Sequence, residues 1–221
     1  MGINVALDGP SGAGKSTIAK AVAKKLEYVY VDTGAMYRSI AYYVISKGAD
    51  LSDPEQIKPF LGEISIKLCY TEAGQRVILN DEDVSDKIRT PEISMGASKV
   101  SAIPEVREFL LELQKNIAKE NNIIMDGRDI GTVVLPDAQV KIFLTASPEA
   151  RAERRYKELV EKGMDVKYDD ILNDVITRDY NDTHRKTAPL KPAEGCVMID
   201  TTELDFEQSV EKIISVIKEN I

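Results

Sequence analysis

Residues 9–16 read Gly-Pro-Ser-Gly-Ala-Gly-Lys-Ser and match the pattern G-x-x-x-x-G-K-[ST] at every fixed position. The glycines allow the backbone to curl so that successive N–H groups point at phosphate oxygens. Lys15 brings an ammonium to the β- and γ-phosphates, and the Ser16 hydroxyl is an oxygen ligand of the kind that Mg²⁺ prefers. The segment therefore predicts a site for a nucleoside triphosphate with Mg²⁺. Its predicted binding residues are Gly9, Pro10, Ser11, Gly12, Ala13, Gly14, Lys15, Ser16 and Thr17.

The sequence on either side of this loop supports the same interpretation. Residues 3–8 form a short apolar run typical of a strand, and residues 17–26 have the apolar periodicity of a helix. A helix that starts at the loop directs the positive end of its dipole toward the phosphates. A glycine-rich turn without a ligand is the alternative, and the flanking strand and helix disfavour it. An Asn-Lys-x-Asp segment, which would read guanine in a regulatory GTPase, does not occur in the sequence.

The arginines are grouped although the protein is acidic. There are 29 Lys and Arg against 37 Asp and Glu, which gives a formal net charge of −8. An acidic protein lacks the basic face of a general nucleic-acid binder, so we expect no nucleic-acid partner. Ten of the 29 basic residues are arginines, and the grouping predicts a local site for an anion. Eight of the ten fall into three groups, namely Arg38; Arg107 with Arg128; and Arg151, Arg154, Arg155, Arg178 and Arg185.

Composition and length favour a folded protein of the cytoplasm. The chain has 221 residues, enough for one large domain or two small ones, with 43% hydrophobic and 30% charged residues. Its apolar runs are much shorter than the ~20 residues that span a bilayer, and no secretion signal precedes the first strand. We therefore expect a soluble protein with no membrane partner. Cys69 and Cys196 are expected to be buried thiols rather than a disulfide, and His184 alone cannot build a zinc site.

Strand-like and helix-like segments alternate along the chain, which predicts an α/β fold with a parallel sheet covered by helices on both faces. Strands are expected at 28–32, 123–126, 140–144 and 197–200, and helices at 35–47, 102–120, 148–162, 168–180 and 206–219. A hairpin with strands 64–70 and 76–80 around a turn at 71–75 breaks the alternation and is interpreted as an insert. Because ligands bind outside the carboxyl ends of parallel strands, the motifs that follow Asp8, Asp32 and Asp126 are expected to share one edge of the sheet.

With these segments in place, the sequence resembles the bacterial cytidylate (CMP) kinases. The matching segments are DGPSGAGKS, DTGAMYR, EDVSDKIRTPEI, ASKVSAIPEVRE, DGRDIGTVV and RDYNDTHRKTAPL, in family order from residue 5 to about residue 192. The resemblance implies a three-layer P-loop NTPase core with a five-stranded parallel sheet. It assigns residues 1–32, 101–147 and 188–221 to that core. An acceptor-binding region with the small β-hairpin would span 33–100, and a short helical lid would span 148–187.

The resemblance also implies the reaction, which is transfer of the γ-phosphoryl group of ATP–Mg²⁺ to CMP or dCMP by a monomeric enzyme. A nucleoside monophosphate is mostly a dianion at neutral pH, so its attacking oxygen needs no general base. The difficulty lies in bringing two polyanions together, and bidentate guanidinium groups suit that task. The residues implied for catalysis are Lys15, Arg128, Arg154, Arg155 and Arg185, with Arg151 and Arg155 as further ATP ligands. Asp126 stands where a carboxylate behind Mg²⁺ usually sits, as a further metal-site residue beside Ser16.

The acceptor site follows from the same family match. It comprises Thr33, Tyr37, Arg38, Ser98, Arg107, Arg128, Asp129, Arg178, Asp182 and Arg185. Arg38, Arg128 and Arg185 would hold the phosphate, and Arg178 and Asp182 the sugar. Asp129, Arg107 and Ser98 would read cytosine, because a carboxylate accepts from the N4 amino group, whereas uracil would oppose one acceptor to another.

Alternatives remain for individual residues and for the whole protein. Ser98 would otherwise cap the helix at 102–120, Tyr37 would be a core aromatic, and the arginines of 148–162 would lie on a solvated face. Another small-acceptor kinase, of the adenylate or shikimate type, is the neighbouring alternative for the function. A non-catalytic regulator that only binds a nucleotide is the alternative from another class.

Overall fold

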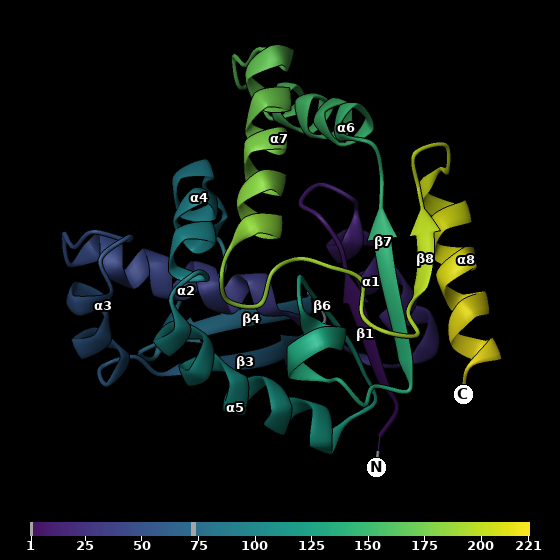
Figure 1. Ribbon diagram of the computed structural model, residues 1–221, viewed down its shortest axis with the longest axis horizontal. Coiled ribbons are helices and arrows are strands. Elements are labelled where there is room, and N and C mark those ends of the chain that lie inside the picture. Colours follow the sequence, from purple (N-terminus) through teal and green to yellow (C-terminus); the bar gives the residue numbers. More distant parts are fainter. Residues whose placement is uncertain (1, 72–73) are drawn as a thin grey trace. The chain divides into compact units, whose positions relative to one another are not determined.

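The computed structural model describes residues 2–71 and 74–221 (Figure 1). The described residues divide into two compact units, one within residues 2–30 and 118–221 and the other within residues 31–71 and 74–117. The division into core, acceptor region and lid stays a prediction, and the helix at 104–120 falls largely in the second unit. The predicted turn at 71–75 includes residues 72 and 73, which lie outside the described residues.

The central sheet has five strands in the order β2-β6-β1-β7-β8, which confirms the α/β class. Its strands are β1 (Asn4–Asp8), β2 (Val29–Asp32), β6 (Ile123–Gly127), β7 (Val140–Thr145) and β8 (Val197–Asp200). β1 pairs in parallel with β6 and with β7, and β7 with β8. The register places Asp8 opposite Gly127 on one side and opposite Phe143 on the other. The carboxyl ends of β1 and β6 are therefore neighbours.

One face of this sheet is covered by two helices, α1 (Lys15–Leu26) and α8 (Phe206–Glu219). Alternate side chains of β1 and β7 point into the core between sheet and helices, and apolar side chains of α1 and α8 meet them there. These core residues include Val5, Leu7, Ile142, Leu144, Ile18, Val22, Val210 and Ile213. Figure 1 shows α8 beside β8. Because alternate residues of a strand face opposite ways, the carboxylate of Asp8 points to the other face of the sheet.

Two further helices of this unit, α6 (Pro148–Glu161) and α7 (Tyr168–His184), pack side by side (Figure 1). Their contact is a separate small core of Ala152, Leu159, Ile171 and Val175. α7 runs to His184, four residues beyond the predicted end at Tyr180. The added turn carries Asp182, one of the predicted acceptor residues. A short π-helix, η2 (Ile130–Val134), follows β6.

The second unit is mainly helical, with a small antiparallel sheet. Its helices are α2 (Thr33–Ser46), α3 (Pro54–Leu61), η1 (Lys87–Arg89), α4 (Pro91–Val100) and most of α5 (Pro104–Glu120). β3 (Ile66–Thr71), β4 (Gly74–Leu79) and β5 (Glu82–Asp83) form the sheet, so the predicted hairpin gains a third, two-residue strand. Sequence reasoning missed α3 and α4, because Pro59 and Gly96 interrupt these short segments.

The cysteines differ from their expected environment. Neither is in a disulfide, as expected, but Cys69 is exposed and Cys196 is half-buried, so the prediction of two buried thiols is wrong. The strand period explains Cys69: Ile66 of β3 is buried, and position 69 lies on the opposite side of the strand. Among the described residues, no helix combines the length and the apolar character needed to cross a membrane.

The start of α8 is stabilised by a capping box, whose contribution to stability can be tested. Asp205 accepts a hydrogen bond from Gln208 N (2.8 Å), and the Gln208 side chain accepts one from Asp205 N (3.0 Å). Such a capping box contributes about 1 kcal/mol. Asp205→Ala is expected to lower the free energy of unfolding by about 1–2 kcal/mol, measured as a lower urea midpoint at unchanged m-value.

Lys167→Ala is the matched control for Asp205→Ala, because Lys167 is the N-cap residue of α7 and its side chain makes no capping hydrogen bond. We expect the control to change stability by less than about 0.5 kcal/mol. Equal losses in the two variants would contradict the assigned role of the capping box.

Candidate functional site

The segment 9–16 runs from the end of β1 into the first turn of α1, at the carboxyl end of the sheet. Gly9 has φ +148°, and a Cβ placed there would lie 1.9 Å from the carbonyl oxygen of Leu144, so only glycine fits. Gly14 (φ +85°) ends the loop, and Lys15 begins the helix. Ser16 and Thr17 lie exposed in the first turn of α1, where helical N–H groups lack partners within the helix. The loop therefore presents amides and hydroxyls at one place, as its sequence predicts.

Lys15 is folded back into the loop. Its Nζ donates to the carbonyl oxygen of Pro10 (2.7 Å), and the residue is only 5% exposed. Burial, and after it the positive charge of Arg128, lowers the pKa of Lys15 well below its usual value. Asp126, Asp8 and Asp182 act in the opposite direction. A polyphosphate beside Lys15 would favour its charged form, because an opposite charge nearby reverses such a shift.

Ser16 and Asp126 are in direct contact. Ser16 Oγ donates to Asp126 Oδ2 (2.6 Å), and Tyr30 OH donates to Asp126 Oδ1 (3.2 Å). The carboxylate is 3% exposed and lies behind the hydroxyl. Hydroxyl and carboxylate oxygens are hard ligands that suit Mg²⁺, which binds few protein groups and retains phosphate and water ligands. The donor set therefore fits a Mg²⁺ ion that accompanies a triphosphate.

Four predicted acceptor residues of the first unit form two ion pairs. Arg128 Nε donates to Asp182 Oδ2 (2.9 Å), and Arg185 Nη2 lies 3.4 Å from Asp129 Oδ1. Burial acts to raise the pKa of Asp182, but the charges of Arg128, Arg178 and Arg185 bring it below its usual value. α7 supplies Asp182, and Arg178 lies one helical turn before it on the same helix. Residues more than 50 positions apart in sequence thus meet in one cluster.

The carboxylate of Asp8 was not among the predicted site residues. Its two oxygens accept from the backbone N–H groups of Ile130 and Gly131, each at 2.8 Å. These amides begin η2, directly after Arg128 and Asp129. Burial raises the pKa of Asp8 from 3.8 to about 6, although the two amides and Lys15 act to lower it. The only sequence signal was a carboxylate at the end of an apolar strand, immediately before the phosphate-binding loop.

The arginines of α6 have three different environments. Arg151 is 2% exposed, so the solvated-face alternative is wrong for this residue. It donates to the carbonyl oxygens of Ala146 and Ser11 (2.9 Å each) and binds both oxygens of Asp179 on α7 (3.0 and 2.5 Å). Arg151 therefore ties the phosphate-binding loop to α7. Arg154 Nη2 donates to the carbonyl oxygen of Thr201 (2.5 Å), and Arg155 pairs with Glu158 (2.8 Å) at the surface.

In the second unit, Arg38 lies beside the start of α2. Arg38 Nη2 donates to Asp32 Oδ2 (2.8 Å), while Asp32 Oδ1 caps α2 by accepting from Ala35 N (2.9 Å). Burial acts to raise the pKa of Asp32, but Arg38 and the Ala35 amide bring it below its usual value. Arg38 Nε is buried and has no hydrogen-bond partner among the described residues. A buried donor of this kind fits an anionic ligand, since leaving it unpaired is costly.

The other predicted acceptor residues of the second unit lie on three helices. Thr33 is the buried first residue of α2. Tyr37 is half-buried, with the Arg107 guanidinium 5.7 Å from its ring centroid, so it is not a plain core aromatic. Ser98 lies inside α4, so the alternative that it caps the helix at 102–120 is wrong. Arg107 of α5 donates to the carbonyl oxygen of Ser101 (3.1 Å).

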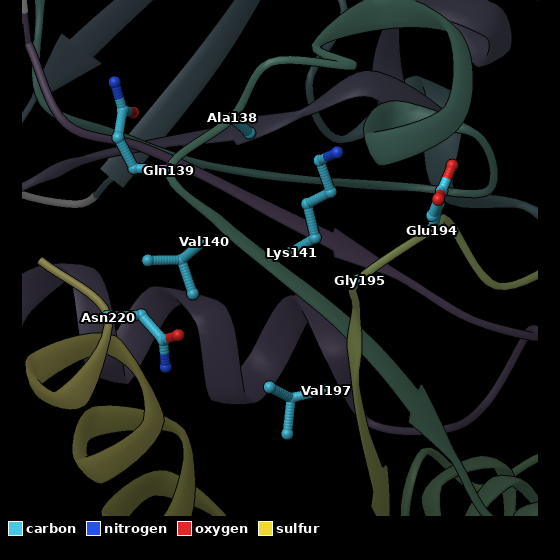
Figure 2. A pocket seen from close by; sticks show the side chains of 8 residues that line it. All are labelled: Ala138, Gln139, Val140, Lys141, Glu194, Gly195, Val197 and Asn220. Carbon is cyan, nitrogen blue, oxygen red and sulfur yellow. The ribbon is translucent and has the colours of Figure 1, made fainter.

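A small hollow of about 180 Å³ lies away from these residues (Figure 2). Val140 and Val197 in its lining belong to the amino ends of β7 and β8, whereas the phosphate-binding loop follows the carboxyl end of β1. Its polar and charged lining side chains are Gln139, Lys141, Glu194 and Asn220. None of the predicted site residues lines it.

Comparison with known proteins places this chain in a family. The chain matches the family described as Cytidylate kinase over residues 5–219. A cytidylate kinase from Caldanaerobacter subterraneus subsp. tengcongensis is 52% identical over 218 residues, which are 99% of this chain and 96% of that protein. One from Carboxydothermus hydrogenoformans is 48% identical over 215 residues, 97% of each.

A solved structure, that of an uncharacterised protein from Eubacterium ventriosum, has a similar fold. Its TM-score is 0.52 at 13% identity, and the match covers 98% of each chain. At this identity the likeness bears on the fold alone.

The raised pKa of Asp8 predicts an unusual dependence of stability on pH. Between its ordinary pKa of 3.8 and about 6, the folded chain retains a proton that the unfolded chain has lost, so the contribution of Asp8 to stability falls as the pH rises. The difference between these two pKa values corresponds to about 3 kcal/mol. The charged or titratable groups that interact with Asp8 are Asp129, Lys15, Arg128 and Cys196.

Asp8→Asn removes this titration. The difference in unfolding free energy, variant minus parent, is expected to increase by about 2–3 kcal/mol between pH 4 and pH 7, whatever its value at pH 4. Urea unfolding at half-unit pH intervals measures it. A difference that stays constant or decreases with pH would show that the pKa of Asp8 is not raised.

Proposed function

Because the chain belongs to the cytidylate kinase family, we propose that it transfers the γ-phosphoryl group of ATP to CMP or dCMP and releases ADP with CDP or dCDP. One observation of the molecule carries the proposal most directly. The phosphate-binding loop and the cluster of Arg128, Asp129, Asp182 and Arg185 belong to the same compact unit. The phosphate-binding loop, which would be the donor cradle, therefore lies in the same unit as cations that suit a second phosphate.

The chemistry needs positioning and positive charge more than acid–base catalysis. The acceptor phosphate, whose second pKa is ~6, is already ionised at neutral pH and attacks without a general base. Lys15 and the amides at the start of α1 would hold the β- and γ-phosphates. Arg128 and Arg185 would neutralise the repulsion as the acceptor approaches. Both are bound to carboxylates that fix their orientation before the substrate arrives.

The metal site is proposed at Ser16, with Asp126 behind it. Mg²⁺ bound with ATP would supply charge neutralisation at the β- and γ-phosphates. The 2.6 Å hydrogen bond from Ser16 Oγ to Asp126 holds the hydroxyl in place, and Tyr30 holds the carboxylate. The protein's part is therefore to orient one oxygen ligand and to place one negative charge behind it.

Recognition of the acceptor is divided among residue types. Arg38, Arg128 and Arg185 would bind the phosphate, and the unpartnered Arg38 Nε supports the first of these. Arg178 and Asp182 would contact the sugar. Thr33 and Tyr37, at the start of α2, would complete this side of the acceptor site. Asp129, with Arg107 and Ser98, would read the cytosine ring, because uracil would oppose a carbonyl to the Asp129 carboxylate.

The remaining arginines would act on the donor side. Arg151 and Arg155 are proposed ATP ligands, and Arg154 and Arg155 would neutralise charge as the phosphoryl group moves. Since Arg154 is bound to Thr201 and Arg155 to Glu158, such a role requires each to exchange its partner for phosphate. We place the enzyme in the cytoplasm as a monomer acting on small molecules, without nucleic acid or membrane.

An acceptor screen tests the function. The purified protein with ATP–Mg²⁺ is assayed for ADP release with CMP, dCMP, UMP, AMP and shikimate. Release with CMP or dCMP well above the other acceptors supports the proposal. Preference for AMP or shikimate would assign another acceptor, and release that no acceptor stimulates would indicate a nucleotide-binding regulator.

Lys15→Met tests the donor cradle. Turnover of CMP is expected to fall on the order of 10²–10³-fold, because a fixed charge at the transferred group is lost. The fold should survive, since burial already disfavours the charge of Lys15 in the free protein. Lys24→Met, at an exposed position of the same helix, is the control and should leave turnover unchanged. Undiminished turnover in Lys15→Met would refute the assigned cradle.

Asp129→Asn tests base recognition. An amide serves the uracil carbonyl as well as the cytosine amino group, so the ratio of kcat/KM for CMP to that for UMP is expected to fall by about tenfold or more. Asp137→Asn, at an exposed position eight residues along the chain, is the control. An unchanged ratio in Asp129→Asn would remove this residue from base selection.

A further inference from the structure

Asp8 is a buried carboxylate that the phosphoryl-transfer mechanism leaves without a role. It is the last residue of β1, one position before the phosphate-binding loop, and is 3% exposed. Both of its oxygens are used, on the amides of Ile130 and Gly131 at 2.8 Å each. Its partners lie more than 120 positions along the chain. Burying a charge is costly unless it is well paired, and here the pairing is concentrated on one turn.

That turn connects the two predicted acceptor residues Arg128 and Asp129 to η2. Asp129 is the N-cap residue of η2, a position where an aspartate side chain commonly caps the helix. Here the Asp129 side chain makes no capping hydrogen bond, and it lies instead 3.4 Å from Arg185. Asp8 provides the cap from the neighbouring strand. The Asp129 carboxylate is thereby kept for the acceptor side of the site.

The turn also lies too close to its surroundings to shift without consequence. A Cβ on Gly131 would lie 3.1 Å from the Cβ of Ala193 and 3.5 Å from Asp8 Oδ2. Because β1 and β6 are hydrogen-bonded with Asp8 opposite Gly127, the carboxylate reaches across the end of the neighbouring strand. Two bonds from one planar carboxylate to successive amides fix the orientation of the turn as well as its position.

We infer that Asp8 is a positioning residue that holds the turn of Arg128–Gly131 against the end of β1 and so sets the selectivity for cytosine through Asp129. This inference rests on the proposed function, in which Asp129 reads the base. The strand that leads into the donor cradle would also orient the group that distinguishes acceptors. A single buried carboxylate would thus fix the position of Asp129 relative to the phosphate-binding loop.

Asp8→Asn is the first test, because it removes the charge and turns one acceptor into a donor that faces an amide. Asp129 is then less well held, so the ratio of kcat/KM for CMP to that for UMP should fall by about tenfold. KM for CMP should rise by a similar factor, while KM for ATP changes by less than about twofold. A merely structural role would raise KM for both CMP and ATP and leave the CMP/UMP ratio unchanged. That result would overturn the inference.

Gly131→Ala moves the turn from the other side, with Asp8 intact. Its methyl group would lie 3.1 Å from the Cβ of Ala193, so the turn must shift, and the CMP/UMP ratio should fall as in Asp8→Asn. It also decides the matter if Asp8→Asn fails to fold, because an unchanged ratio in Gly131→Ala would overturn the inference. Ile213→Val, on the buried side of α8, is the control for loss of stability alone and should leave the ratio unchanged.

The double variant Asp8→Asn/Asp129→Asn separates this inference from the proposed function. If Asp8 acts through Asp129, the double variant should have the same CMP/UMP ratio as Asp129→Asn alone. If the fall in the CMP/UMP ratio in the double variant equals the product of the two single falls, Asp8 acts by another route and the inference is overturned. If Asp129→Asn alone keeps the ratio, the base-reading assignment fails first. If Asp129→Asn lowers the CMP/UMP ratio and Asp8→Asn leaves it unchanged, only the inference about Asp8 fails.

Discussion

Opposite charges buried together at the carboxyl ends of β1 and β6 are the interaction on which the site depends. Lys15, Arg128, Asp8, Asp126 and Asp182 are close enough to shift one another's pKa, and burial makes each charge depend on its neighbours. A buried charge without a partner is strongly destabilising, so the cluster fixes the relation between the loop, η2 and α7. The same low polarity strengthens what these groups do to a bound polyanion. Stability and the proposed function would therefore depend on the same contacts.

Much of the architecture could be predicted because its signals are local. The loop at 9–16 is recognised by glycine, lysine and serine at fixed spacing. The buried strands are recognised by continuous apolar runs. The bounds of the strand at 197–200 and of the helix at 206–219 were predicted to the residue, because the apolar pattern of each segment ends clearly in the sequence. The short helices α3 and α4 were missed, because their proline and glycine are local signals for the opposite conclusion.

Candidate site residues could be named from the sequence, but their contacts could not. Arg128 and Asp182 were both named from family motifs, yet nothing in the sequence pairs residues 54 positions apart. Arg151 was expected to bind ATP, and its buried contacts with Ser11 and Asp179 were not foreseen. Asp8 escaped notice because its partners are backbone amides, which carry no side-chain identity. Contacts to the backbone are the part of a site that a single sequence conceals most completely.

The two thiols give the chain a built-in pair of attachment points. Cys69 is exposed in the unit of residues 31–117, and Cys196 is half-buried in the other unit. Burial raises the pKa of Cys196, so a maleimide dye would attach first to Cys69, and a second dye could follow at the slower thiol. The two units could therefore be labelled one after the other, without any engineered cysteine.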